Sequence, residues 1–127
     1  MNFIKQTIAL RMHDDGKVFY QEIDAHVCGN YAYHKSVSPY NKRQKYNVTY
    51  IPTGMSLPIP IPHVYAIDTI KKAKQIIDVY KSEVGEIIPW KIWHYDYFDL
   101  DLYYLDLDKE IERIVQDRIH KIFKIEY

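Results

Sequence analysis

The chain has 127 residues, enough to bury one hydrophobic core, and we expect a single domain over residues 1–127. Its formal net charge is zero, which argues against a protein devoted to nucleic acid over its whole surface. Cys28 is the only cysteine, so no intrachain disulfide can form. We therefore expect a cytoplasmic protein, and polar residues near the N-terminus predict neither a signal peptide nor a membrane span.

The first half of the chain predicts strands. Alternating apolar and polar residues indicate strands near 3–13 and 18–28, joined at Asp15-Gly16, a dipeptide typical of tight hairpin turns. Extended segments follow at 31–37 and 46–51, the second ending in the turn signal Pro-Thr-Gly. Prolines at 58, 60 and 62 predict an extended connector, because proline has no backbone N–H to donate.

The second half predicts two helices. Asp68 or Thr69 can cap a helix that ends before Gly85, and a last helix runs from about residue 108 to 124. Residues 94–105 lie between them and alternate as in one strand. The order β-β-β-β-α-β-α predicts an α+β fold, a mostly antiparallel sheet of about five strands with two helices packed on one face.

Charge is distributed unequally along the chain. Residues 34–75 hold seven lysines and arginines against Asp68 alone, whereas residues 92–112 hold seven acids against Lys109 alone. Thirteen tyrosines add rings with a polar end, which favour binding surfaces. The acidic and tyrosine-rich segment is therefore the first candidate for contact with a partner.

If residues 94–105 form one strand, alternate tyrosines and aspartates share its outer face. We expect this face and the following acids to bind a partner protein with a basic surface, through Tyr95, Tyr97, Asp99, Asp101, Tyr103, Asp106 and Asp108. Three alternatives remain open. The acids can form a plain solvated face with ordinary helix N-terminal residues, partly mimic nucleic-acid phosphates, or hold a hard cation such as Ca²⁺ or Mg²⁺.

A basic segment supports another function. Binding to nucleic acid would use cations for phosphates and rings for stacking, namely Tyr40, Lys42, Arg43, Lys45 and Tyr46. No glycine loop, ligand spacing or catalytic constellation is present, so we expect a protein that is not an enzyme and has no cofactor, with a metal-dependent enzyme as the last alternative.

Two short motifs carry a resemblance. "VTYIPTG" at 48–54 followed by "TIKKA" at 69–73 resembles small phage and mobile-element proteins of Gram-positive bacteria, in which V-T-x-x-P-T-G precedes T-x-K-x-A. The chain departs from that pattern at Tyr50, where histidine is frequent, and in its proline-rich insertion. The resemblance implies a mobile-element origin, a host protein with a basic surface as the partner, and a role similar to that of inhibitors of host defence, such as anti-CRISPR proteins.

Overall fold

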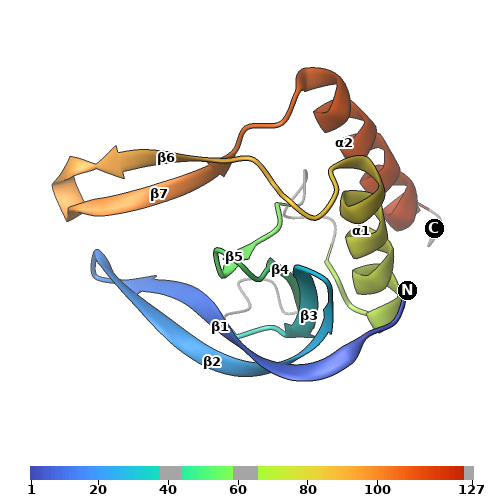
Figure 1. The fold of residues 1–127 in the computed structure, drawn as a ribbon, viewed down its shortest axis with the longest axis horizontal. Coiled ribbons are helices and arrows are strands. Elements are labelled where there is room, and N and C mark those ends of the chain that lie inside the picture. Colours follow the sequence, from blue (N-terminus) through green and yellow to red (C-terminus); the bar gives the residue numbers. More distant parts are fainter. Residues whose placement is uncertain (38–43, 59–65, 125–127) are drawn as a thin grey trace.

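The computed structural model describes residues 1–37, 44–58 and 66–124 (Figure 1). Most of the proline-rich connector lies outside these ranges. The described elements are β1 (Ile4–Asp14), β2 (Lys17–Cys28), β3 (Tyr31–Lys35), β4 (Tyr46–Tyr50), β5 (Met55–Ser56), α1 (Ile70–Glu83), β6 (Trp90–Tyr95), the 3-10 turn η1 (Asp96–Phe98), β7 (Leu100–Leu105) and α2 (Lys109–Lys124).

Strands β1 to β5 form an antiparallel sheet in sequence order. Its two ends meet, because the Arg11 backbone N–H donates a 3.0 Å hydrogen bond to the carbonyl oxygen of Gly54, in the turn between β4 and β5. The sheet therefore bends back towards its first strand. A small apolar cluster lies on the face shared by β1, β2 and β3, with the buried residues Ile8, Leu10, Ala25, Val27 and Ala32.

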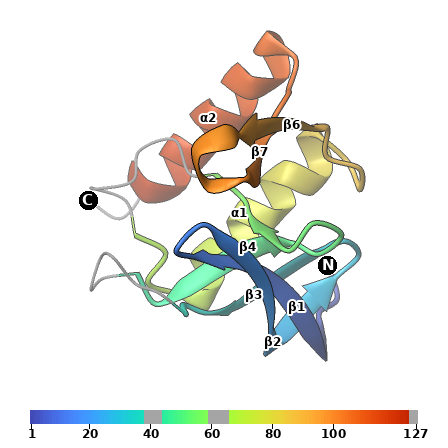
Figure 2. The same ribbon diagram turned by 90° about the vertical axis from the view of Figure 1, so that its left-hand side faces the viewer.

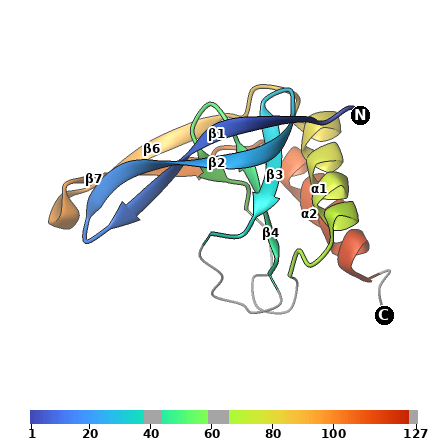
Figure 3. The same ribbon diagram turned by 90° about the horizontal axis from the view of Figure 1, so that it is seen from below.

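The β1–β2 hairpin extends well beyond the rest of the sheet (Figures 1 and 3). The predicted turn is confirmed, because Asp15 and Gly16 have φ values of 50° and 74° and join Asp14 to its partner Lys17. Strand β2 pairs with β1 along its length, but with β3 only from His26 to Cys28. The distal half of this hairpin is therefore a two-stranded arm.

Both helices lie on the β3–β4 side of the sheet (Figure 2). Helix α1 begins at the predicted cap, where the Thr69 hydroxyl accepts a 3.2 Å hydrogen bond from the Lys72 N–H, and its C-cap Val84 is followed by Gly85 at φ 96°. It packs on β3 and β4, while α2 packs on α1. This main core includes the fully buried Tyr31, Ile76, Ile77 and Ile119.

The α+β prediction is confirmed, with a five-stranded antiparallel sheet, a separate two-stranded sheet and two helices. The order of elements differs from the prediction. The short β5 is additional, and the single strand predicted over residues 94–105 is wrong, since the chain reverses at η1 and forms the β6–β7 hairpin. Within the described ranges, neither helix has the length and apolar character that crossing a membrane requires.

Candidate functional site: the β6–β7 hairpin

The acidic, tyrosine-rich segment forms a projecting hairpin (Figure 1). Tyr95 pairs with Leu100 across the turn, and Asp99 adopts the left-handed conformation at φ 49°, which aspartate tolerates better than most residues. The local sequence explains this turn, because two runs rich in β-formers flank Asp-Tyr-Phe-Asp. The predicted row of alternate tyrosines and aspartates is therefore divided between two strands and a turn.

Directly opposed residues of a hairpin share a face. One face carries the pairs Trp93–Leu102 and Tyr95–Leu100, and we call these four residues the ring face. Ring centroids of Trp93 and Tyr95 are 5.5 Å apart, and those of Tyr95 and Tyr97 are 6.4 Å apart, so the aromatic row continues to the tip. The opposite face carries the pairs His94–Asp101 and Ile92–Tyr103.

The acids gather around His94. Its Nδ1 lies 2.8 Å from Asp101 Oδ1, and its Nε2 lies 3.5 Å from Asp96 Oδ1 and 3.4 Å from Asp99 Oδ1. The hydrogen bond to Asp101 raises the pKa of His94, and the negative charges around the ring raise it further. We call Asp96, Asp99 and Asp101 the tip acids; their net charge with His94 depends on pH.

The structure brings four of the predicted partner-binding residues close to the tip and separates three. Tyr95, Tyr97, Asp99 and Asp101 lie in or next to the turn. Tyr103 lies under the Arg11 guanidinium, 4.9 Å from its ring centroid. Asp106 forms a 3.1 Å ion pair with Lys91, and Asp108 accepts a 2.9 Å hydrogen bond from the Glu110 N–H at the start of α2. The last two therefore have partners within the chain, and their contact with another protein stays a prediction.

Three important residues of the hairpin were not among those predicted for partner contact: Trp93, His94 and Asp96. Their importance depends on cross-strand pairs, which become visible only after the reversal at 96–99 is recognised. A sequence signal did exist, since two six-residue runs flank a four-residue segment bounded by aspartates. That segment predicts a hairpin loop as well as it predicts a continued strand.

The basic segment proposed for nucleic acid is only partly described. Tyr40, Lys42 and Arg43 lie outside the described residues. Lys45 is exposed, whereas Tyr46 is half-buried with its ring centroid 6.5 Å from that of Tyr33, against the main core. Tyr46 therefore contributes to packing, and no observation in the described part favours stacking on a base.

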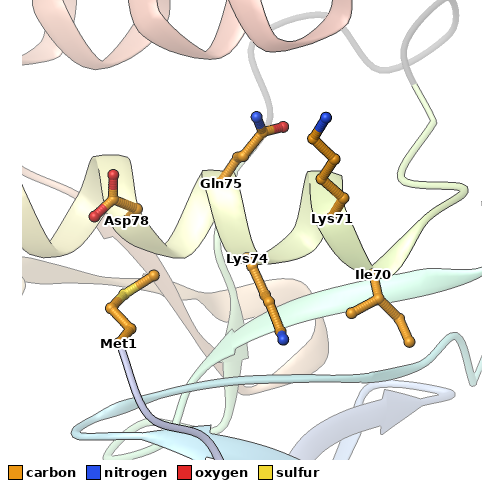
Figure 4. Close-up of a pocket in the computed structure, with 6 residues that line it drawn as sticks. All are labelled: Met1, Ile70, Lys71, Lys74, Gln75 and Asp78. Carbon is orange, nitrogen blue, oxygen red and sulfur yellow. The ribbon is translucent and has the colours of Figure 1, made fainter.

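A shallow hollow of about 540 Å³ lies beside α1 and is lined by Met1, Ile70, Lys71, Lys74, Gln75 and Asp78 (Figure 4). Its two lysines point to opposite sides of the helix, and Lys74 Nζ lies 5.2 Å from the Phe3 ring centroid. The cations therefore do not converge on one ligand. Nor do the described ranges bring three or more His, Cys, Asp or Glu side chains together in an arrangement that could hold a metal ion.

Comparison with known proteins adds no relative. No family model matches the chain, and neither the curated proteins nor the solved structures give a match. Functional inference therefore depends on the geometry of the hairpin.

Proposed function

We propose that the protein is a non-enzymatic binding module that engages a basic surface of a partner protein through the tip of the β6–β7 hairpin. One observation carries the proposal. At the end of this projecting hairpin, the side chains of Asp96 and Asp99 are both 97% exposed, and Tyr97 between them is 81% exposed. An exposed ring between solvated carboxylates matches the composition of interface anchors.

The physical roles of the two residue types differ. The tip acids attract a basic surface over several ångströms and accelerate encounter, whereas the rings supply the apolar area that stabilises the complex. Among the described residues, Asp96 and Asp99 form their ion pairs with His94, while the Arg11 guanidinium contacts the carbonyl oxygen of Asp101 and not its carboxylate. In finer detail, the resemblance to phage and mobile-element proteins favours an inhibitor that binds a protein of the host.

The proposal is tested by affinity capture from the lysate of a Gram-positive bacterium, with and without nuclease. Asp96→Asn combined with Asp99→Asn removes both exposed charges, and asparagine retains the tolerance for positive φ that position 99 requires. The matched control is Glu22→Gln combined with Asp117→Asn, which removes two exposed carboxylates from other surfaces.

We expect the wild type and the control to retain the same protein after nuclease treatment, and the tip variant to lose it while its circular dichroism spectrum is unchanged. Retention of that protein by the tip variant would contradict the proposal. If nuclease treatment removed all of the captured protein, the result would instead support the nucleic-acid alternative, in which the basic segment makes the contact.

A further inference from the structure

Two arms project from the same side of the molecule (Figure 1). The first arm is the distal part of the β1–β2 hairpin, residues 10–21, and the second arm is the β6–β7 hairpin, residues 90–105. Arg11 joins them, because one of its terminal nitrogens donates a 2.7 Å hydrogen bond to the carbonyl oxygen of Asp101. The distance between the arms is therefore fixed at this point, and beyond it both ends extend further.

A groove of about 430 Å³ lies between the ends of the arms. The second arm contributes the whole ring face, Trp93, Tyr95, Leu100 and Leu102. The first arm contributes His13, Asp15 and Gly16. One wall is therefore apolar and aromatic, and the other wall carries a carboxylate.

These walls present the two features that an arginine side chain requires. A guanidinium stacks on tryptophan or tyrosine rings through a cation–π contact and pairs with a carboxylate through two parallel hydrogen bonds. The Trp93 side chain is available for stacking, since 54% of its surface is exposed. Asp15 is exposed and forms no ion pair with another described residue.

The negative charge at the ends of the arms also favours a basic occupant of the groove. The ends of the arms carry five carboxylates, Asp14 and Asp15 on the first arm and the three tip acids on the second. The cations near them are Lys17 and the Arg11 guanidinium at the Asp101 carbonyl oxygen, so negative charge remains in excess. A basic segment is attracted to this end, whereas an acidic or purely apolar segment gains nothing from the carboxylates.

We propose that the groove between the arms receives an arginine side chain from an extended basic segment of the partner protein, with its guanidinium between the ring face and Asp15. This inference rests on the proposed function, since it specifies which part of a basic partner enters the molecule. The tip acids attract the segment, and the groove then binds one of its side chains.

The test uses a fluorescently labelled synthetic peptide of glycine and serine with three spaced arginines, and a second peptide with citrulline in place of each arginine. Citrulline keeps the planar shape but has no charge. Full-length protein is titrated into each peptide, and fluorescence anisotropy gives the dissociation constant. The groove variants are Asp15→Asn, which suits the positive φ of that position, and Trp93→Leu. Asp117→Asn on α2 is the matched control.

We expect binding of the arginine peptide to weaken about threefold in Asp15→Asn and about fivefold in Trp93→Leu, and to be unchanged in Asp117→Asn. The citrulline peptide should bind far more weakly than the arginine peptide. If the arginine peptide depends on the tip acids but not on Asp15 or Trp93, the groove inference is overturned and the proposed function stands. If no variant of either arm affects binding, or no binding occurs, both are overturned.

Discussion

The Arg11 guanidinium hydrogen-bonds the carbonyl oxygen of Asp101 at 2.7 Å and also lies over the Tyr103 ring. This residue holds the two hairpins together, since the backbone of Arg11 belongs to β1 and its guanidinium contacts Asp101 and Tyr103 on β7. The guanidinium also donates a 3.8 Å hydrogen bond to Met55 Sδ on β5. The backbone N–H of Arg11 closes the sheet onto Gly54. One residue thus fixes the position of the second arm relative to the first.

Replacing Arg11 should loosen the second arm. We expect Arg11→Met to lower the free energy of unfolding by about 1 kcal/mol, because one charge-assisted hydrogen bond and a cation–π contact are lost at a partly exposed site. Urea unfolding gives the stability, and hydrogen exchange should show faster exchange at the amides of β6 and β7. The control is Arg113→Met, whose guanidinium is exposed and forms a 4.0 Å ion pair with Glu110. Equal hydrogen exchange at the β6 and β7 amides in the two variants would show that Arg11 does not hold the second arm in place.

The turn at Gly54 should not accept a side chain. Gly54 has φ 69°, and a Cβ there would lie 2.7 Å from the Arg11 backbone nitrogen and 2.8 Å from the Ala9 carbonyl oxygen. Gly85 is the matched control, because its φ is 96° but a Cβ would meet nothing within 4 Å. We expect Gly85→Ala to cost about 1 kcal/mol from backbone strain alone, and Gly54→Ala to cost about 3 kcal/mol. Thermal unfolding of both variants measures the stability that each loses. Equal losses would show that the closure of the sheet at Gly54 contributes nothing to the stability of the fold.

The pKa of His94 should lie above its ordinary value of 6.5. NMR titration of the ring protons measures it directly, and Asp101→Asn should lower it, since the hydrogen bond to Asp101 is the largest cause of the increase. Protonated His94 reduces the negative charge of the tip. Binding of a basic partner should therefore strengthen as the pH rises through this pKa, and His94→Gln should remove that dependence.

The sign for stability is the opposite. A histidine whose pKa is higher in the folded state stabilises the fold at pH values below its unfolded pKa, and this contribution is lost as the pH rises through the folded pKa. The effect should be small because the ring is half-exposed. A His94 pKa at or below 6.5 would contradict the arrangement of acids around it.

Glu86 should stabilise the fold only above its pKa. Its carboxylate accepts a 2.9 Å hydrogen bond from the Asn30 N–H and lies 3.0 Å from Lys81 Nζ. The hydrogen bond from Asn30 is the main reason that its pKa lies below the ordinary 4.5. This stability is present above pH 4.5 and is lost as the pH falls through the lowered pKa.

Unfolding of the wild type and of Glu86→Gln over a range of acidic pH tests this prediction. The stability of Glu86→Gln should fall less steeply as the pH decreases, because glutamine does not titrate. Glu22→Gln, at an exposed position on β2, should keep the wild-type slope. If the stability of the wild type and of Glu86→Gln fell equally as the pH decreases, the lowered pKa of Glu86 would not contribute to stability.

Features encoded by a few adjacent residues were predictable from the sequence. Asp15-Gly16 specifies its turn through positive φ at both positions, and Thr69 with Gly85 specifies the ends of α1. In each case the flanking residues favour the same local structure. The α+β class followed from the order of such local elements.

The second arm was not predictable in the same way. Alternation of apolar and polar residues continues through the turn at 96–99, so the period of two does not show where the chain reverses. The position of Arg11 beside Asp101 and of Gly54 beside β1 also depends on contacts between distant parts of the chain. Hence the hairpin's acidic and aromatic character was visible in the sequence, but its two faces were not.

The hydrogen bond between Arg11 and Gly54 also determines where the protein can change in length. Inserting a residue into the turn at 51–54 would displace the carbonyl oxygen that meets β1, so natural variants of this fold should keep that turn at constant length. The loop at 96–99 joins β6 to β7, and none of its described residues belongs to either core, so it can lengthen or shorten without disturbing them. Evolution of new partners would therefore proceed by insertion and deletion at the end of the second arm.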